Sequence, residues 1–166
     1  MKKIYIGFSK PTTKLPLFAW LIQFVEKTPY DHVYIGIEEP MYNNYMIFQA
    51  SKEMVNLYNP DIFAQTNKTI KEYELSCTDD QYKDIWLFAI NNLGTPYGLS
   101  QDFGILISKI FKTKQLFSNK TKEEICSELA ARVCNILGIK INEDFDLIDP
   151  KEMDKILQDA KVRQVL

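Results

Sequence analysis

The hydrophobic pattern of the chain changes its period near Asp79, and this change constrains the fold more than any other feature of the sequence. Before Asp79, short runs alternate apolar and polar residues, as half-buried strands do. After Asp79, apolar residues recur at every third or fourth position, which marks one face of a helix. Strands followed by helices are typical of an α+β fold, and 166 residues suit one core. We expect a single α+β domain over residues 1–166, with helices packed on an antiparallel sheet.

Short runs with a period of two predict the strands of that sheet. The clearest is His32–Glu38, HVYIGIE, in which every second residue is Val or Ile. A turn centred between Pro40 and Met41 would make Tyr45–Ala50 its hairpin partner and would place Gln49 directly opposite His32. A slip of one residue would instead turn Gln49 to the other face. The remaining predicted strands are Lys3–Phe8, a run within Glu53–Tyr58, and Thr69–Leu75.

Four segments predict helices. The apolar run from Leu15 to Glu26 predicts a mostly buried helix, and Asp79–Leu93 predicts an amphipathic helix that ends at Gly94. Thr121 and Glu124 have the spacing of a capping box that opens the last of the four. The apolar stripe of that last helix, which ends before Gly138, consists of Cys126, Leu129, Ala130, Val133 and Leu137. The remaining predicted helix is Gln101–Lys112.

Charge and cysteine content exclude several classes of function. Lys and Arg total 20 against 22 acids, so a net charge of -2 offers nucleic acid no attraction. Three cysteines at irregular spacing are typical of a reducing compartment. Cys126 and Cys134 lie about 12 Å apart along a helix, too far to form a disulfide. Without a CxxC or HxxxH pair, we predict no metal and no other cofactor.

The apolar segment Leu15–Val25 is the candidate for a membrane span or an export signal. Its eleven residues fall short of the roughly 20 that a membrane span needs, so we predict no transmembrane segment. No small-residue cleavage site follows the segment, so we predict no export signal and a cytoplasmic protein. Peripheral membrane contact through this segment stays open. Richness in Lys, Asn and Ile indicates an AT-rich bacterial or phage genome.

The residues that could perform chemistry are a thiol and the only histidine. A thiol nucleophile needs a base beside it and a polar group that orients the base. His32 is the only imidazole in the chain, and the hairpin brings the Gln49 amide within its reach. A cysteine on an apolar helix stripe is nevertheless more often a small buried hydrophobe than a nucleophile, so these residues alone leave both interpretations of Cys126 open.

Three segments resemble, in order, the motifs of the permuted NlpC-type papain-like amidases, including the YiiX-like group. They are YDHVYIGIE at Tyr30–Glu38, FQAS at Phe48–Ser51 and ICSELA at Ile125–Ala130. Asp149, Pro150 and Met153 are similar to a short proline-led helix that follows in such proteins.

The resemblance implies a circularly permuted papain-like fold and a role for each site residue. Cys126 would be the nucleophile, His32 the general base and then acid, and Gln49 the orienting group. The resemblance also implies a helix that begins close to Cys126 rather than at Thr121. Two positions depart from the family pattern: Asp31 stands where serine is common, and Gln49 where a carboxylate is common.

The function implied by the resemblance is that of a cysteine hydrolase. It would cleave an amide bond, of a peptide or of peptidoglycan type, or an ester bond, through an acyl-enzyme on Cys126. Two alternatives stay open. The related lecithin retinol acyltransferase branch suggests thiol-dependent transfer of a lipid acyl group, and a non-catalytic papain-like binding module would keep the same residues without activity.

Overall fold

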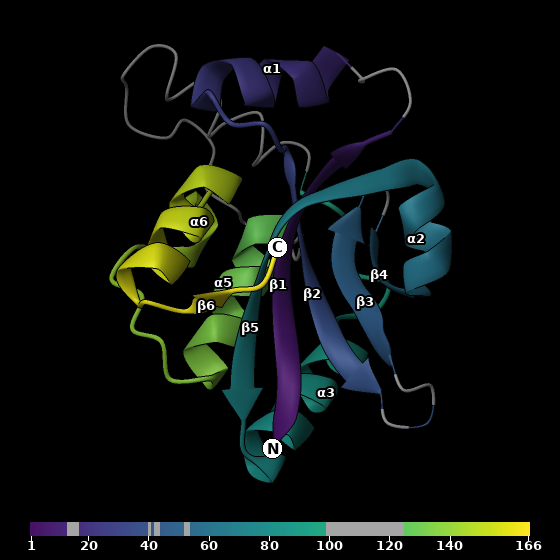
Figure 1. The fold of residues 1–166 in the computed structure, drawn as a ribbon, viewed down its shortest axis with the longest axis vertical. Coiled ribbons are helices and arrows are strands. Elements are labelled where there is room, and N and C mark those ends of the chain that lie inside the picture. The colour runs from purple at the N-terminus through teal and green to yellow at the C-terminus, as the bar shows by residue number, and fades with distance from the viewer. Residues whose placement is uncertain (13–16, 40, 42–43, 52–53, 99–124) are drawn as a thin grey trace.

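The computed structural model describes residues 1–12, 17–39, 41, 44–51, 54–98 and 125–166. Within these ranges the fold is α+β: six strands form one antiparallel sheet, in the order β4-β3-β2-β1-β5-β6, and helices pack on it (Figure 1). The predicted fold class, α+β on an antiparallel sheet, is therefore confirmed. The strands are β1 (Lys2–Pro11), β2 (His32–Glu39), β3 (Asn44–Ser51), β4 (Met54–Tyr58), β5 (Asn67–Cys77) and β6 (Arg163–Gln164); the helices are α1 (Leu17–Glu26), α2 (Pro60–Thr66), α3 (Asp79–Asn92), α5 (Cys126–Ile136), the short 3-10 helix η1 (Phe145–Leu147) and α6 (Pro150–Asp159).

One face of the sheet carries the main core. Val33, Ile35 and Ile37 of β2 are fully buried on this face. Leu129 and Val133 of α5 belong to the same buried cluster, and Figure 1 shows α3 and α5 behind the strands. The alternation in β2 and the apolar stripe of α5 are thus the two halves of one hydrophobic core.

The opposite face of the sheet packs against α2. Tyr34 of β2 and Phe63 of α2 share a second buried cluster, with ring centroids 5.0 Å apart. No predicted element corresponds to α2, although the sequence carries a capping signal for this helix. The side chain of Asn59 accepts from the backbone N–H of Asp61 at 2.8 Å, and Pro60 occupies the first turn.

Several predicted bounds need correction. β1 continues past Phe8 to Pro11, because its last residues pair with the start of β5. The expected burial of α1 fails at two of its described side chains, since Trp20 and Phe24 are 48% and 66% exposed. The predicted helix Gln101–Lys112 and the capping box before Cys126 lie outside the described residues. No helix in the described part of the chain is both long and apolar enough to cross a membrane.

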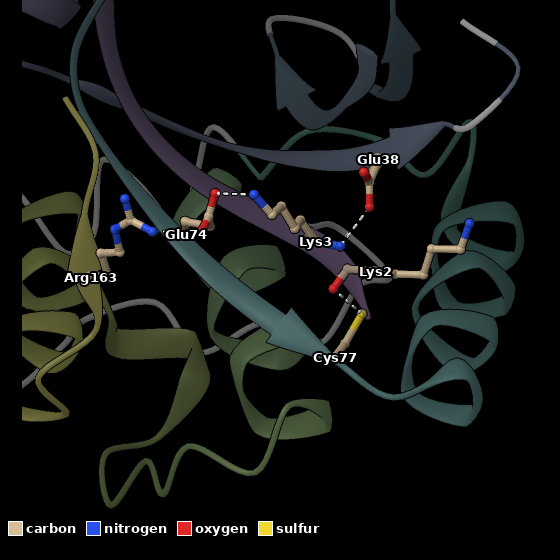
Figure 2. A network of polar contacts seen from close by, with 6 residues as sticks. All are labelled: Lys2, Lys3, Glu38, Glu74, Cys77 and Arg163. Atoms are coloured by element: carbon tan, nitrogen blue, oxygen red, sulfur yellow. Dashed lines mark hydrogen bonds and ion pairs between the residues drawn. The ribbon is translucent and has the colours of Figure 1, made fainter. Parts of the chain in front are cut away.

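Polar contacts hold the N-terminal end of β1 to its neighbours, as Figure 2 shows. The backbone N–H of Lys3 donates to Glu38 at the end of β2 at 2.8 Å. The Lys3 ammonium lies 2.9 Å from the Glu74 carboxylate of β5, which Arg163 of β6 also approaches at 3.4 Å. Pairs this exposed contribute about 1 kcal/mol at most, so they support the strand register without determining it.

Gly7 of β1 allows a close approach that no other residue would permit. Its strand partner on β2 is Tyr34, and a β-carbon built at Gly7 would overlap the Tyr34 ring. We expect Gly7→Ala to lower the free energy of unfolding by about 3 kcal/mol, measured by chemical denaturation. In a Tyr34→Leu background the added methyl group should cost much less. An equal loss of free energy of unfolding in both backgrounds would show that the Tyr34 ring is not the reason for a glycine at position 7.

Candidate active site

The structure brings His32 and Gln49 into direct contact. The Nε2 atom of His32 lies 2.7 Å from the Oε1 atom of Gln49. An amide oxygen can only accept, so Nε2 must carry the proton and Nδ1 must carry the lone pair. His32 is therefore held in the tautomer in which Nδ1 can accept a proton, as a general base requires.

The register that makes this contact differs from the predicted one. Ile35 pairs with Phe48, so continuing the ladder places Gln49 opposite Tyr34 and not opposite His32. The prediction that Gln49 faces His32 directly is wrong by two positions along the strand. Side chains alternate with a period of two, so this shift keeps Gln49 on the same face as His32, and the two meet as a diagonal pair.

Neighbouring residues hold the Gln49 amide in place. Its Nε2 group donates to Asn56 Oδ1 of β4 at 3.3 Å, and the Asn56 Nδ2 group donates to Ser51 Oγ at 3.1 Å. Gln49 is buried, so few other partners compete for the amide. These bonds direct the amide oxygen toward His32, as the predicted orienting role of Gln49 requires.

Burial dominates the electrostatics of His32. It lowers the pKa of the imidazole to about 4, and the bond to Gln49 offsets only part of this effect. His32 is therefore neutral at pH 7. A neutral glutamine orients the ring but supplies none of the charge with which a carboxylate would stabilise imidazolium.

Cys126 is the first residue of α5. The N-cap is Ile125, whose side chain cannot accept a hydrogen bond, so the helix begins without a side-chain cap. The predicted helix start close to Cys126 is confirmed. The next two residues anchor this first turn, because the Ser127 hydroxyl donates to the Ile148 carbonyl and the Glu128 carboxylate pairs with Arg132.

The position of Cys126 relative to His32 follows from the packing of α5. Cys126 is 3% exposed and belongs to the same core cluster as Val33 and Ala50, which directly follow His32 and Gln49 in the sequence. Alternation turns His32 and Gln49 toward the opposite face, where the His32 ring lies 6.5 Å from that of Phe63. In Figure 1 the first turn of α5 lies at the end of the sheet where β2 begins. His32 is the first residue of β2, so the thiol and the imidazole would meet around this end, and their contact stays a prediction.

The other two cysteines lie in structural positions. Cys134, in the third turn of α5, is fully buried, and burial raises its pKa to about 12. Cys77 ends β5, where its thiol lies 3.4 Å from the Lys2 carbonyl oxygen and burial raises its pKa (Figure 2). None of the three cysteines is part of a disulfide. No group of three or more metal-binding side chains occurs among the described residues.

A buried cluster that the sequence analysis missed fixes the segment before His32. The Asp154 carboxylate of α6 accepts from the hydroxyls of Tyr30 and Tyr73 at 2.7 and 2.6 Å and from the Lys71 ammonium at 2.9 Å. Burial raises the pKa of Asp154, but these hydrogen bonds outweigh it and lower the pKa overall. The only sequence signal was a carboxylate next to the apolar Met153, which did not identify its distant partners.

Comparisons of the chain with family models and with curated proteins found no match. The functional interpretation therefore depends on the geometry of His32, Gln49 and Cys126 and on the resemblance of three sequence segments.

The low pKa of His32 predicts a pH dependence of stability. Between pH 6.5 and about 4 the unfolded chain binds a proton at His32 that the folded chain does not. The free energy of unfolding should therefore fall as the pH falls through this window, by at most about 3 kcal/mol. Chemical denaturation at several pH values measures it. His32→Gln keeps a donor for Gln49 but cannot titrate, so its free energy of unfolding should not show this fall between pH 6.5 and about 4. The same pH dependence in the wild type and in His32→Gln would contradict the low pKa of His32.

Proposed function

We propose that this chain is a cysteine hydrolase of the permuted NlpC-type papain-like group, which cleaves an amide or ester bond through an acyl-enzyme on Cys126. The single observation that carries the proposal is the bond between His32 and Gln49. It holds the only imidazole of the chain in the tautomer that a thiol needs as its base. The start of α5 at Cys126 supports it, because a thiol at a helix N-terminus is stabilised as thiolate.

In the first step Cys126 attacks the substrate carbonyl carbon. The thiol proton passes to Nδ1 of His32 as the sulfur–carbon bond forms, and the carbonyl π electrons move to the oxygen. Since His32 is neutral at pH 7, it is ready to accept this proton. The negative charge that develops on sulfur favours imidazolium and offsets part of the cost that burial imposes on it.

Backbone groups at the start of α5 would stabilise the oxyanion. The first helical hydrogen bond joins the Leu129 N–H to the Ile125 carbonyl. The N–H groups of the first turn point out of the N-terminal end of the helix, as in any α-helix. Donors of this kind, aimed at a developing oxyanion, lower the barrier for acyl transfer.

Collapse of the tetrahedral intermediate breaks the bond to the leaving group. The leaving amine or alcohol takes the proton from His32, and the acyl group stays on Cys126 as a thioester. A water molecule then attacks the thioester while His32 accepts one of its protons. His32 returns this proton to the Cys126 sulfur as the carboxylic acid leaves, which restores the neutral pair.

An exposed aromatic pair favours acyl transfer as a second candidate. The rings of Trp20 and Phe24 on α1 are stacked with centroids 5.3 Å apart, and both are exposed. The same helix reaches the site, because Gln23 donates to Asp31, the residue before His32, at 2.8 Å. An apolar surface beside the site suits a lipid acyl group, and product analysis with water and with an amine acceptor distinguishes hydrolysis from transfer.

An electrophilic acyl probe followed by mass spectrometry tests the proposed nucleophile. We expect the label on Cys126 and not on Cys77 or Cys134. His32→Ala should slow labelling about 100- to 10,000-fold, the usual contribution of a general base. Gln49→Ala should slow it about tenfold, the effect of one hydrogen bond.

Two control variants make this test specific. Cys134→Ala removes a thiol from the same helix, and Glu74→Gln removes an ion pair at the far end of the sheet (Figure 2). Both should label at the wild-type rate. Equal labelling of wild type and His32→Ala would contradict the enzyme and favour a non-catalytic binding module, in which the buried Cys126 is only part of the core.

A further inference from the structure

Ser9 of β1 is a buried polar residue without an evident structural role. It is 0% exposed, and its hydroxyl oxygen has no hydrogen-bond partner among the residues that the structure describes. Leaving a buried hydroxyl unpaired costs about 1–3 kcal/mol, and alanine would fill nearly the same space without this cost. Such a group calls for a role outside the resting hydrogen bonds of the fold.

The strand register places Ser9 in the candidate site. Ser9 is the direct partner of His32 across β1 and β2, and the Asp31 N–H donates to the Ser9 carbonyl at 3.2 Å. Directly opposed side chains on antiparallel strands have β-carbons about 5 Å apart. The register between β1 and β5 also shifts between Phe8 and Ser9, and irregularities of this kind often re-aim side chains beside active sites.

The orientation of the His32 ring turns its unused nitrogen away from Gln49. Nε2 points toward Gln49 on β3. The two nitrogens of an imidazole point in nearly opposite directions, so Nδ1 points away from β3. Because β2 lies between β3 and β1, this is the side of the ring on which Ser9 lies.

We propose that Ser9 is a positioning residue of this site, whose hydroxyl binds Nδ1 of His32. A rotation about its Cα–Cβ bond would direct the hydroxyl to the ring. In the free chain the hydroxyl donates to Nδ1 of the neutral ring. It releases this lone pair before Nδ1 takes the Cys126 proton, and it then accepts from Nδ1–H. It would thereby supply some of the stabilisation of imidazolium that the neutral Gln49 cannot. The catalytic importance of this contact rests on the proposed function, whereas the contact itself does not.

The other residue that lies directly opposite Ser9 already has a hydrogen-bond partner. On its other side Ser9 pairs with Thr69 of β5, whose hydroxyl lies 3.1 Å from the Tyr34 hydroxyl. The Tyr34 hydroxyl in turn donates to the Glu72 carboxylate at 2.6 Å. Thr69 is thus bonded without Ser9, which leaves His32 as the partner among the two described residues that lie directly opposite Ser9.

NMR of the single histidine tests this contact directly. The full chain would be labelled with 15N-histidine and carry Cys126→Ala, so that no thiol acts on the ring, and a long-range 1H–15N spectrum at pH 7 would report Nδ1 separately from Nε2. We expect Nδ1 to resonate upfield of an unbonded imidazole nitrogen and to move downfield in Ser9→Ala. Ser76→Ala, which changes an exposed serine of β5, should leave it in place.

An Nδ1 signal at the unbonded position, or one that Ser9→Ala leaves unchanged, would overturn the contact. The first outcome is measured with Ser9 in place. It therefore tests the contact even if Ser9→Ala fails to fold. With Cys126 restored, Ser9→Ala should slow acyl labelling about tenfold, and an acyl group found on Ser9 would overturn the positioning role. An Nδ1 response in a chain whose Cys126 takes no label would overturn the proposed function and the catalytic role of Ser9, but not the contact.

Discussion

The register of β2 between β1 and β3 is the constraint on which the rest of the structure depends. Val33, Ile35 and Ile37 enter the core, and burial of each contributes about 2 kcal/mol. A slip of one residue would move all three to the other face, so the hydrophobic effect enforces the register. The same alternation aligns His32 with Ser9 on one side and brings it to Gln49 on the other. The polar residues of the site are thus placed by the burial of their apolar neighbours.

Local patterns predicted most of this arrangement, and long-range contacts account for what they missed. The strand at His32 and the apolar stripe of α5 follow from periodicity, which depends only on nearby residues. The pairing of Phe48 with Ile35 depends on the length of the hairpin turn, which composition did not determine. The Asp154 cluster joins Tyr30 to α6 across 124 positions, and no local signal reports such a contact. The exposure of Phe24 likewise depends on which neighbours cover α1.

Among the residues that the structure describes, the polar partner of the His32 imidazole is a neutral amide and not a carboxylate. Burial keeps His32 neutral at pH 7, and Gln49 orients the ring without adding charge. We therefore infer that the resting imidazole is neutral and takes up a proton only as the substrate is attacked. A buried hydroxyl at Ser9 fits this account, because a group that can both donate and accept can bind the ring in either protonation state.

The rate of Cys126 alkylation as a function of pH tests whether the Cys126 thiol uses His32 as its base. We predict that at pH 7 the wild-type chain reacts at least about tenfold faster than His32→Ala, as expected when one charge-assisted contact is lost. The wild-type profile should also show an inflection from the imidazole that the variant lacks. Superimposable profiles for the two proteins would contradict the claim.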